Sequence, residues 1–260
     1  MGFRIRRAKV LVGAAAGLAA MAGSVGMAGS AGAASSASPQ ISGNWAGYAA
    51  SGSNITSVAG TWTVPAAGTL PPGVSSTWVG IGGFTTSDLI QAGTQQVSSP
   101  LDQVFAGGAY GAWYEMLPDN PVFITGCAGD AKCTVNPGDA MNVTVANQGG
   151  NSWKISMADG SHWSWSGTFN YVSTESSAEW IHEAPSLAGA LPIPVGNSGT
   201  VTFDGAANSA VIGGATRSIG ASGAVPVEAL PVETTTSALD SDGDGFNVCT
   251  YSLSCAAPAS

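Results

Sequence analysis

From residue 41 onward, hydrophobic and polar residues alternate in short runs, and Gly, Pro, Asn and Ser separate these runs. Alternation with a period of two indicates β-strands, because successive side chains of a strand point to opposite faces of a sheet. No run in this part of the chain keeps the 3.6-residue period of an amphipathic helix. Predicted strands cover Asn44–Ala50, Val58–Val64, Ser76–Ile81, Leu89–Thr94, Tyr110–Leu117, Asn142–Ala146, Trp153–Met157, His162–Tyr171, Ala178–Glu183, Thr200–Phe203, Val225–Glu233 and Phe246–Tyr251.

These strands predict the architecture of the chain. Turn residues between them recur about every ten residues, which is typical of antiparallel sandwiches and barrels. Neither an internal repeat nor a long linker divides the chain. We therefore expect a single all-β domain, and a two-sheet antiparallel β-sandwich rather than a barrel.

The N-terminal segment has a different pattern. A basic start, from Arg4 to Lys9, precedes the apolar run 10–21, and small residues then lead to Ala33. This order is typical of a secretory signal peptide, and the apolar run is too short to span a membrane. We expect a signal peptide over 1–33, a short Ser-rich lead over 34–41 and the folded domain over 42–260. The mature protein is expected to be secreted, extracellular and monomeric, without a membrane segment.

Composition and charge restrict the possible partners. Hydrophobic residues make up 44% of the 260 residues and include 8 Trp, which favours a packed core over disorder. Beyond residue 10 the only Lys and Arg are Lys132, Lys154 and Arg217, so the chain has no basic surface for a nucleic acid. When the acidic residues protonate at low pH, few positive charges remain to repel one another. The composition therefore suits a protein that works in acid.

Four cysteines fit an oxidising compartment outside the cell. Cys127 lies near Cys133, and Cys249 lies near Cys255. Three pairings are possible, and two local disulfides, Cys127–Cys133 and Cys249–Cys255, are the simplest. A zinc site is not expected, because five residues separate each pair and no His lies nearby.

Several common catalytic and metal-binding motifs are missing from the sequence. His162 and His182 are the only histidines, which excludes a HExxH helix, and there is no G-x-S-x-G motif. The segment Asp240-Ser-Asp242-Gly-Asp244-Gly245 resembles the start of a calcium-binding loop. However, its twelfth residue is Tyr251 instead of Glu, and no helices flank it. We expect a polar hairpin turn there, and we expect neither a metal nor a cofactor.

Strand alternation sorts a set of polar and aromatic residues onto shared faces. Within each strand, Trp78, Gln91 and Glu179 point away from the apolar neighbours on either side, and Trp113 shares a face with Glu115. If the strands are neighbours, these five residues line one face of one sheet. The alternative is an ordinary solvent-facing sheet surface, and the pattern alone does not exclude it.

Six segments in order resemble the glutamic endopeptidases, or eqolisins. They are Ser42-Gly-Asn-Trp-Ala-Gly-Tyr48, Gly60-Thr-Trp-Thr-Val-Pro65, Trp78-Val-Gly-Ile81, Leu89-Ile-Gln-Ala-Gly93, Ala112-Trp-Tyr-Glu115 and Ala178-Glu-Trp-Ile181. The resemblance implies a sandwich of the lectin/glucanase (concanavalin-like) type with a substrate groove on one concave face. It also implies an acid-active, metal-independent endopeptidase whose substrates are polypeptides. The catalytic dyad it implies is Gln91 and Glu179, and Trp78, Trp113 and Glu115 fall where the family builds its groove.

The chemistry of such a dyad is coherent. An ionised Glu179 can take a proton from water and return it to the leaving nitrogen. The carboxamide of Gln91 can donate to the developing oxyanion and orient the water. The chain departs from the family at Gly82 and Gly111, where acidic residues occur in relatives, so its substrate preference does not follow from the resemblance.

A second function of another class competes with the first. A β-sandwich can bind glycans or proteins without hydrolysis, and a glycosidase would use Glu115 and Glu179 as its two carboxylates. A carboxylate separation of about 5 Å or about 6.5–9.5 Å, with Gln91 elsewhere, would favour the glycosidase. The presence of Gln91 in its motif favours the peptidase.

Overall fold

The computed structural model describes residues 38–68, 70–98, 101–103, 107–185, 194–229 and 234–260. The predicted signal peptide, 1–33, lies outside the described residues. In the described part, no helix is long and apolar enough to cross a membrane. The helical elements of this part are two short 3-10 turns, η1 (Leu101–Gln103) and η2 (Gly220–Ser222).

The first sheet contains the strands that carry all the candidate site residues. Its neighbours are antiparallel, except that β1 runs parallel to β15. β1 begins at Gln40, inside the segment 34–41 that was expected to be a lead. In spatial order the strands are β1 (Gln40–Ser42), β15 (Val225–Ala229), β2 (Trp45–Ser51), β11 (Ser177–Glu183), β4 (Val74–Ile81), β5 (Ile90–Val97), β6 (Tyr110–Met116) and β7 (Val122–Phe123).

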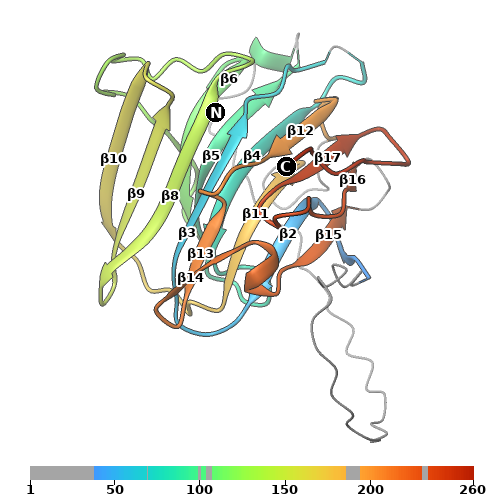
Figure 1. The fold of residues 1–260 in the computed structure, drawn as a ribbon. Coiled ribbons are helices and arrows are strands. Elements are labelled where there is room, and N and C mark those ends of the chain that lie inside the picture. Colours follow the sequence, from blue (N-terminus) through green and yellow to red (C-terminus); the bar gives the residue numbers. More distant parts are fainter. Residues whose placement is uncertain (1–37, 69, 99–100, 104–106, 186–193, 230–233) are drawn as a thin grey trace, which may run out of the picture.

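The second sheet is antiparallel throughout its described strands. In spatial order they are β10 (Trp163–Asn170), β9 (Ser152–Asp159), β8 (Ala140–Gly149), β3 (Ile55–Thr63), β12 (Thr200–Phe203), β17 (Phe246–Thr250) and β16 (Thr234–Thr236). A hairpin of β13 (Ser209–Ile212) and β14 (Ala215–Ser218) also pairs with β3. The two sheets lie face to face (Figure 1), which confirms the predicted antiparallel sandwich.

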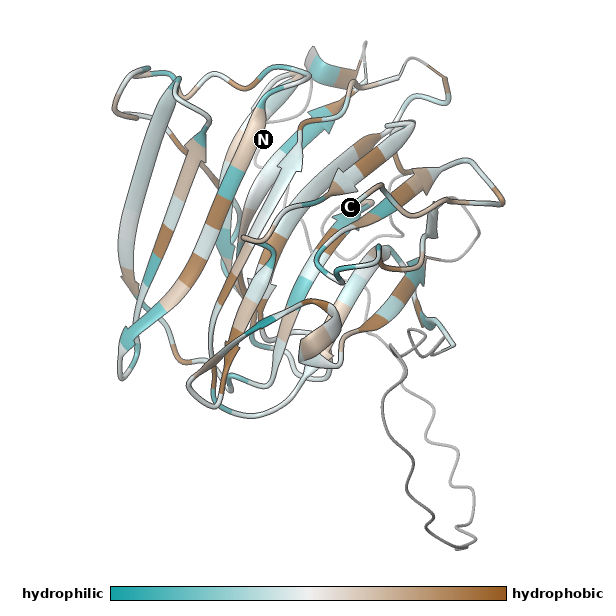
Figure 2. Ribbon diagram, viewed as in Figure 1, coloured by the Kyte–Doolittle hydropathy of each residue, from teal (hydrophilic) through white to brown (hydrophobic). Residues whose placement is uncertain are grey.

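Alternation along the strands builds the core between the sheets. Figure 2 shows hydrophobic and hydrophilic bands alternating along β8, β9 and β3. The largest buried side chains of this core include Trp153, Trp180, Phe203 and Phe246. The buried indole of Trp180 has a partner, since its Nε1 donates to the carbonyl oxygen of Ala59 at 2.8 Å. This bond removes the cost of burying an unpaired N–H group.

Each of the twelve predicted strand segments overlaps an observed strand, although residues 230–233 of one segment lie outside the described part. The β13–β14 hairpin was not predicted. Its turn is Gly213-Gly214, and both residues have positive φ, 59° and 82°. A two-residue glycine turn of this kind is a sequence signal for a hairpin. The flanking runs are only four residues long and contain Ala, Thr and Ser, so they lack the alternating pattern that predicts strands.

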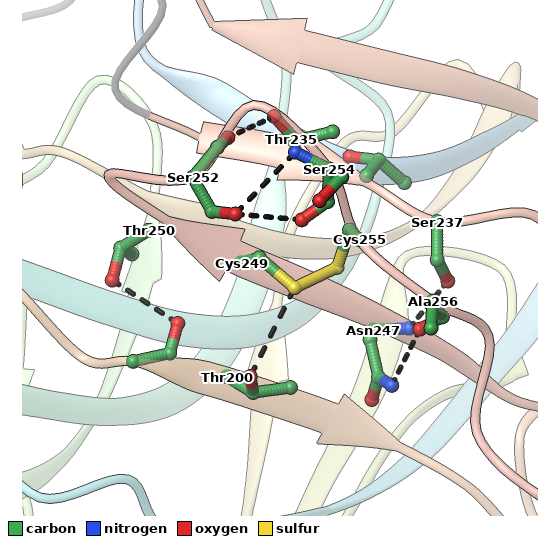
Figure 3. The surroundings of a disulfide bond; sticks show 12 residues. Thr200, Thr235, Ser237, Asn247, Cys249, Thr250, Ser252, Ser254, Cys255 and Ala256 are labelled. Carbon is green, nitrogen blue, oxygen red and sulfur yellow. Dashed lines mark hydrogen bonds between the residues drawn. A yellow bond between two sulfur atoms is a disulfide. The ribbon is translucent and has the colours of Figure 1, made fainter.

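Both predicted disulfides are present. Cys127 pairs with Cys133, and Cys249 pairs with Cys255, with Cα atoms 5.4 Å and 5.6 Å apart. Figure 3 shows the second bridge at the end of β17, where the Thr200 hydroxyl of the adjacent strand lies 3.9 Å from Cys249 Sγ. This disulfide therefore anchors the C-terminal segment to the second sheet.

His182 of β11 is buried on the face of the first sheet opposite to Glu179, as its parity predicts. Its Nδ1 lies 3.0 Å from the hydroxyl of Thr77. Burial lowers the pKa of His182 from 6.5 to about 3, because the charged imidazolium would lose its hydration. Between pH 6.5 and about 3, the unfolded chain binds a proton at this residue that the folded chain does not.

We therefore expect His182 to make folding less stable as the pH falls through this window, by up to about 4 kcal/mol. In His182→Asn, the loss of unfolding free energy between pH 7 and pH 3 should be smaller than in the wild type. Urea unfolding at pH 7, 5 and 3 measures this, and His162→Asn, which changes an exposed histidine, is the control. Equal pH dependence in His182→Asn and the wild type would contradict the expectation.

Candidate active site

The candidate residues form one row across four neighbouring strands of the first sheet. Glu179 of β11 pairs with Gly80 of β4, Gly80 pairs with Gln91 of β5, and Gln91 pairs with Glu115 of β6. Directly paired residues of antiparallel strands project from the same face of a sheet. This face points away from the second sheet, because Val79, Ala92 and Trp180, the neighbours of opposite parity, belong to the core.

Gly80 lies between Glu179 and Gln91 in this row. Two strand spacings, about 10 Å, separate the backbones of Glu179 and Gln91. A Cβ atom at Gly80 would lie 2.9 Å from Leu89 Cδ1, 3.0 Å from Trp78 Cζ3 and 3.1 Å from Gln91 Cβ. The missing side chain at Gly80 therefore makes room for the side chains of Leu89, Trp78 and Gln91.

Glu115 orients the amide of Gln91. Gln91 Nε2 donates a hydrogen bond to Glu115 Oε2, while Gln91 Oε1 is buried without a hydrogen-bond partner. An ionised carboxylate can only accept, so it holds the N–H side of the amide toward β6. One of the two amide hydrogens is used in this bond, and the second remains available.

A small cavity of about 30 Å³ adjoins this row. Gln91, Glu115 and Trp113 line it, and so do Gln95, Ser76, Glu183, Pro121, Phe123 and Pro185. This volume is about that of one water molecule. Trp113 Nε1 is a buried donor without a partner, so the cavity walls include both an unpaired donor and an unpaired acceptor, Gln91 Oε1.

The site is more enclosed than the open groove that the resemblance implied. Glu179 is 0% exposed, Gln91 2% and Glu115 6%. Apolar side chains fill the outer face around the row, in a cluster of Trp45, Ala49, Trp78, Leu89, Trp113, Ile181 and Val227. The row is therefore buried in this arrangement, and the space beside it is about the volume of one water molecule.

Trp78 and Trp113 both lie on this face, but they have different surroundings. Trp113 lines the cavity, whereas Trp78 is fully buried and packs edge-on against Trp45 with ring centroids 4.9 Å apart. Trp78 Nε1 donates to Glu183 Oε2 at 2.8 Å. Trp78 therefore packs beside the row on the same face, and it is not among the residues that line the cavity.

Glu183 also belongs to the candidate site, although no motif in the sequence identifies it. It lines the cavity, and its second oxygen accepts a hydrogen bond of 2.6 Å from Asn44 Nδ2. Its alternation with Glu179 along β11 places it on the same face, and this was the available signal. Glu183 therefore brings a second carboxylate to the cavity wall beside Glu115.

The two glycines that depart from the family have structural explanations. An added Cβ at Gly82 would lie 2.8 Å from the carboxylate of Asp88, so a carboxylate already occupies this neighbourhood. Burial raises the pKa of Asp88, but hydrogen bonds from Thr174, Thr86 and Ser173 outweigh burial and lower the pKa overall. These bonds join the loop before β5 to the loop before β11. An added Cβ at Gly111 would lie 2.8 Å from the Phe123 ring, so this glycine makes room for a cavity wall.

We expect Gly80→Ala to lower kcat about 10–100-fold, because a methyl group there would displace Gln91 from its position in the row. The methyl group would also meet the buried side chains of Leu89 and Trp78, at 2.9 and 3.0 Å. Steady-state peptidase kinetics measure the effect, and the Tm of the variant shows whether the fold persists. Gly43→Ala is the matched control, because an added Cβ there meets nothing within 4 Å. Unchanged kcat in folded Gly80→Ala would show that the site does not need a glycine at this position.

Two groups among the described residues have three ligands close enough to hold a metal ion. They are Asp139, Asp159 and His162, and Asp204, Asp240 and Asp244. Neither group includes a residue of the Glu179–Glu115 row.

Comparison with known proteins places the fold and the family. The sequence pattern of the Peptidase A4 family matches residues 43–251. A structure of scytalido-glutamic peptidase with a peptide-based transition-state analog is similar, with a TM-score of 0.64 and 22% identity over 80% of this chain and 98% of that chain. SCP-B, a member of the eqolisin family in complex with the tripeptide Ala-Ile-His, has a TM-score of 0.62 and 20% identity over the same shares. No curated protein matches the chain.

The family match spans most of the chain and includes every strand of the Glu179–Glu115 row. The structural likeness, at these identities, supports the same β-sandwich fold. The chain therefore belongs to the Peptidase A4 family, the glutamic peptidases or eqolisins.

Proposed function

We propose that this glutamic peptidase is a secreted, acid-active endopeptidase that hydrolyses polypeptides with Gln91 and Glu179. The observation that carries the proposal is the row Glu179–Gly80–Gln91–Glu115, in which a carboxylate and an oriented amide project from the same face of one sheet. The peptide-like ligands of the two similar structures agree with a polypeptide substrate.

The unpaired atoms around the cavity fit a hydrolytic water. A water molecule in this volume could donate to Gln91 Oε1 and accept from Trp113 Nε1. Such a site is polar enough to hold water, because it offers both kinds of hydrogen-bond partner. We propose that the attacking water comes from this site and that it moves toward Glu179, which does not line the cavity, when a peptide binds.

In the proposed mechanism, ionised Glu179 removes a proton from this water as the oxygen attacks the carbonyl carbon. Negative charge develops on the carbonyl oxygen, and the second hydrogen of Gln91 Nε2 stabilises it. Glu179 then transfers the proton to the leaving nitrogen, the C–N bond breaks, and Glu179 is ionised again. One carboxyl group thus serves as base and acid in turn.

Glu115 acts as a positioning residue in this scheme. Its carboxylate holds Gln91 Nε2, so the amide keeps one defined orientation when charge develops on the substrate. We propose that Trp113 contacts the substrate from the cavity wall. Trp78 is proposed to stabilise the site through its packing against Trp45.

The arrangement disfavours a glycosidase. Three strand spacings separate the backbones of Glu179 and Glu115, about 14 Å, and Gln91 lies between them in the row. The hydrogen bond from Gln91 also engages Glu115. A carboxylate pair working on a sugar needs the two groups to face one another across the bond, with no amide between them. A non-hydrolytic module that binds glycans or proteins would need neither the carboxylate nor the oriented amide of this row.

Export is proposed from the predicted signal peptide over 1–33 together with the two disulfides, which form in oxidising compartments. The scarcity of cations in the folded part fits acid conditions outside the cell. A monomer is proposed for the mature protein.

The function is tested by incubating the purified mature protein with denatured casein from pH 2 to pH 7, with pepstatin and EDTA present. We expect internal cleavage of casein at acid pH that neither inhibitor stops, because the proposed site has no paired aspartates and no metal. Mass spectrometry of the products distinguishes internal cleavage from trimming at the ends. An intact casein at every pH, with folded protein, would contradict the proposal.

A further inference from the structure

Three carboxylates outside the candidate active site converge at one end of the β12–β17 ladder. β12 and β17 are neighbours (Figure 1), and Phe203 pairs with Phe246, so the next residues, Asp204 and Gly245, follow directly beyond the last pair. One carboxylate oxygen each of Asp204, Asp240 and Asp244 lies within 4.8 Å of the others. Residues from two distant parts of the chain thus form one cluster.

Backbone hydrogen bonds fix one carboxylate oxygen of Asp240, and the other oxygen has no hydrogen-bond partner. Its Oδ1 accepts hydrogen bonds from the backbone N–H groups of Gly243, Asp244 and Gly245, at 2.9, 3.2 and 3.1 Å. Its own N–H donates to the carbonyl oxygen of Gly245 at 2.9 Å. Asp240 is 8% exposed, and Oδ2 has no hydrogen-bond partner.

Asp244 is similar. It is 9% exposed, and its Oδ1 has no hydrogen-bond partner. Backbone contacts fix the two loops independently of the carboxylates: Asn208 Nδ2 donates to the Asp244 carbonyl at 3.0 Å, and the Thr61 hydroxyl donates to the Asp204 carbonyl at 2.6 Å. The cluster is therefore preformed by the fold.

Gly245 leaves the space toward which the carboxylates point. An added Cβ at this glycine would collide with Asp240 Oδ2 and would lie 3.1 Å from Asp204 Oδ1. The two oxygens, from different loops, thus approach each other beside a residue that has no side chain. This convergence, together with the buried and unpartnered oxygen of Asp240, points to a bound ion.

No Lys, Arg or His in the described part of the chain forms an ion pair with this cluster. Among the described residues the only ion pair is His162–Asp159, at 3.1 Å, which belongs to the other acidic group. The exposed carboxyl of Asp242 also adjoins Asp240 and adds to the negative charge. A buried carboxylate oxygen without a partner is costly, and a cation would remove this cost.

We propose that Asp204, Asp240 and Asp244 form a calcium-binding site. Carboxylate oxygens are the ligands that Ca²⁺ prefers, and Ca²⁺ accepts irregular sets of 6–8 oxygens, whereas Mg²⁺ requires a nearly regular octahedron. Asp204 is exposed, so water can complete the coordination. The ion would join the loop after β12 to the loop between β16 and β17. The site lacks the twelfth-position Glu of an EF-hand, and Asp204 supplies the ligand from another strand.

The test is calcium binding and thermal unfolding of the folded mature protein at pH 7 after removal of metals by chelation. Equilibrium dialysis should show one strongly bound Ca²⁺ per chain in the wild type. With CaCl₂ at ten times Kd, the Tm should rise by about 3–6 °C. The same concentration of MgCl₂ should raise the Tm less.

Asp204→Asn is the main variant, because Asp204 is exposed and the change keeps the shape of the side chain. We expect its calcium affinity to fall about tenfold or more, since affinity follows the number of charged ligands. The control is Asp119→Asn, which changes an exposed aspartate far along the chain and should bind like the wild type. Asp240→Asn should also lose affinity, and its retained Oδ1 can still cap the loop.

Three results would overturn the site. The first is a wild-type protein that neither binds Ca²⁺ nor gains Tm. The second is binding that survives Asp204→Asn but disappears in Asp159→Asn, which would place the ion at the other acidic group. The third is an equal Tm increase with MgCl₂, which would contradict calcium as the ion.

Discussion

Replacement of Glu179 by Gln is expected to reduce casein hydrolysis to near the background rate. The change keeps the size of the side chain, which is fully buried, so the fold should persist. It removes the only group that we propose as acceptor of the water proton and donor to the leaving nitrogen. The loss should appear in kcat, while the affinity for peptide should change little.

Two measurements separate this effect from misfolding. Circular dichroism and Tm of Glu179→Gln should match those of the wild type. Glu228→Gln, which changes a partly exposed glutamate of the same sheet, should keep full activity. A folded Glu179→Gln protein that digests casein at acid pH at the wild-type rate would refute the proposed base.

Replacement of Gln91 by Ala is expected to lower kcat by about 10²–10³-fold, with a smaller change in KM. The amide donor acts on charge that exists mainly in the transition state, so its loss affects kcat more than ground-state binding. The variant also removes the partner of Glu115. Steady-state kinetics on a short peptide substrate measure both constants.

Glu115→Gln tests the positioning role in the same assay. Its effect should be milder than that of Gln91→Ala, because the donor at Gln91 remains and only its orientation is weakened. Gln148→Ala, at the exposed end of β8 in the second sheet, is the control for loss of an amide. A Gln91→Ala protein that raises KM alone would indicate that Gln91 binds substrate without stabilising the transition state.

Local alternation predicted much of the site. The parity of Gln91, Trp113, Glu115 and Glu179 within their strands follows from the two-residue period, and the structure keeps each on the outer face. The same rule placed His182 on the opposite face, where it is buried. Periodicity could decide these positions because it depends only on neighbouring residues in the chain.

Other features of the molecule cannot be predicted from local sequence, for a physical reason. Glu183 shares the parity of Glu179, but only the contact with Asn44 and Trp78 identifies it as part of the site. Asp204 follows an ordinary strand, and nothing in the local sequence relates it to Asp240. Contacts of this kind depend on pairing between distant segments, which no window of the sequence reports.

The amino-acid sequence by itself determined the all-β class, the two local disulfides, the face on which each candidate side chain lies and the family resemblance. Only the tertiary structure decided which strands are neighbours: β11, far along the chain, lies between β2 and β4, and this places Gly80 between Glu179 and Gln91. It also decided that Glu179, Gln91 and Glu115 are buried beside an apolar cluster on the same face. This division depends on distance along the chain. The direction of a side chain is set by adjacent peptide units, whereas strand order, strand register and the burial of the site are set by the packing of two whole sheets.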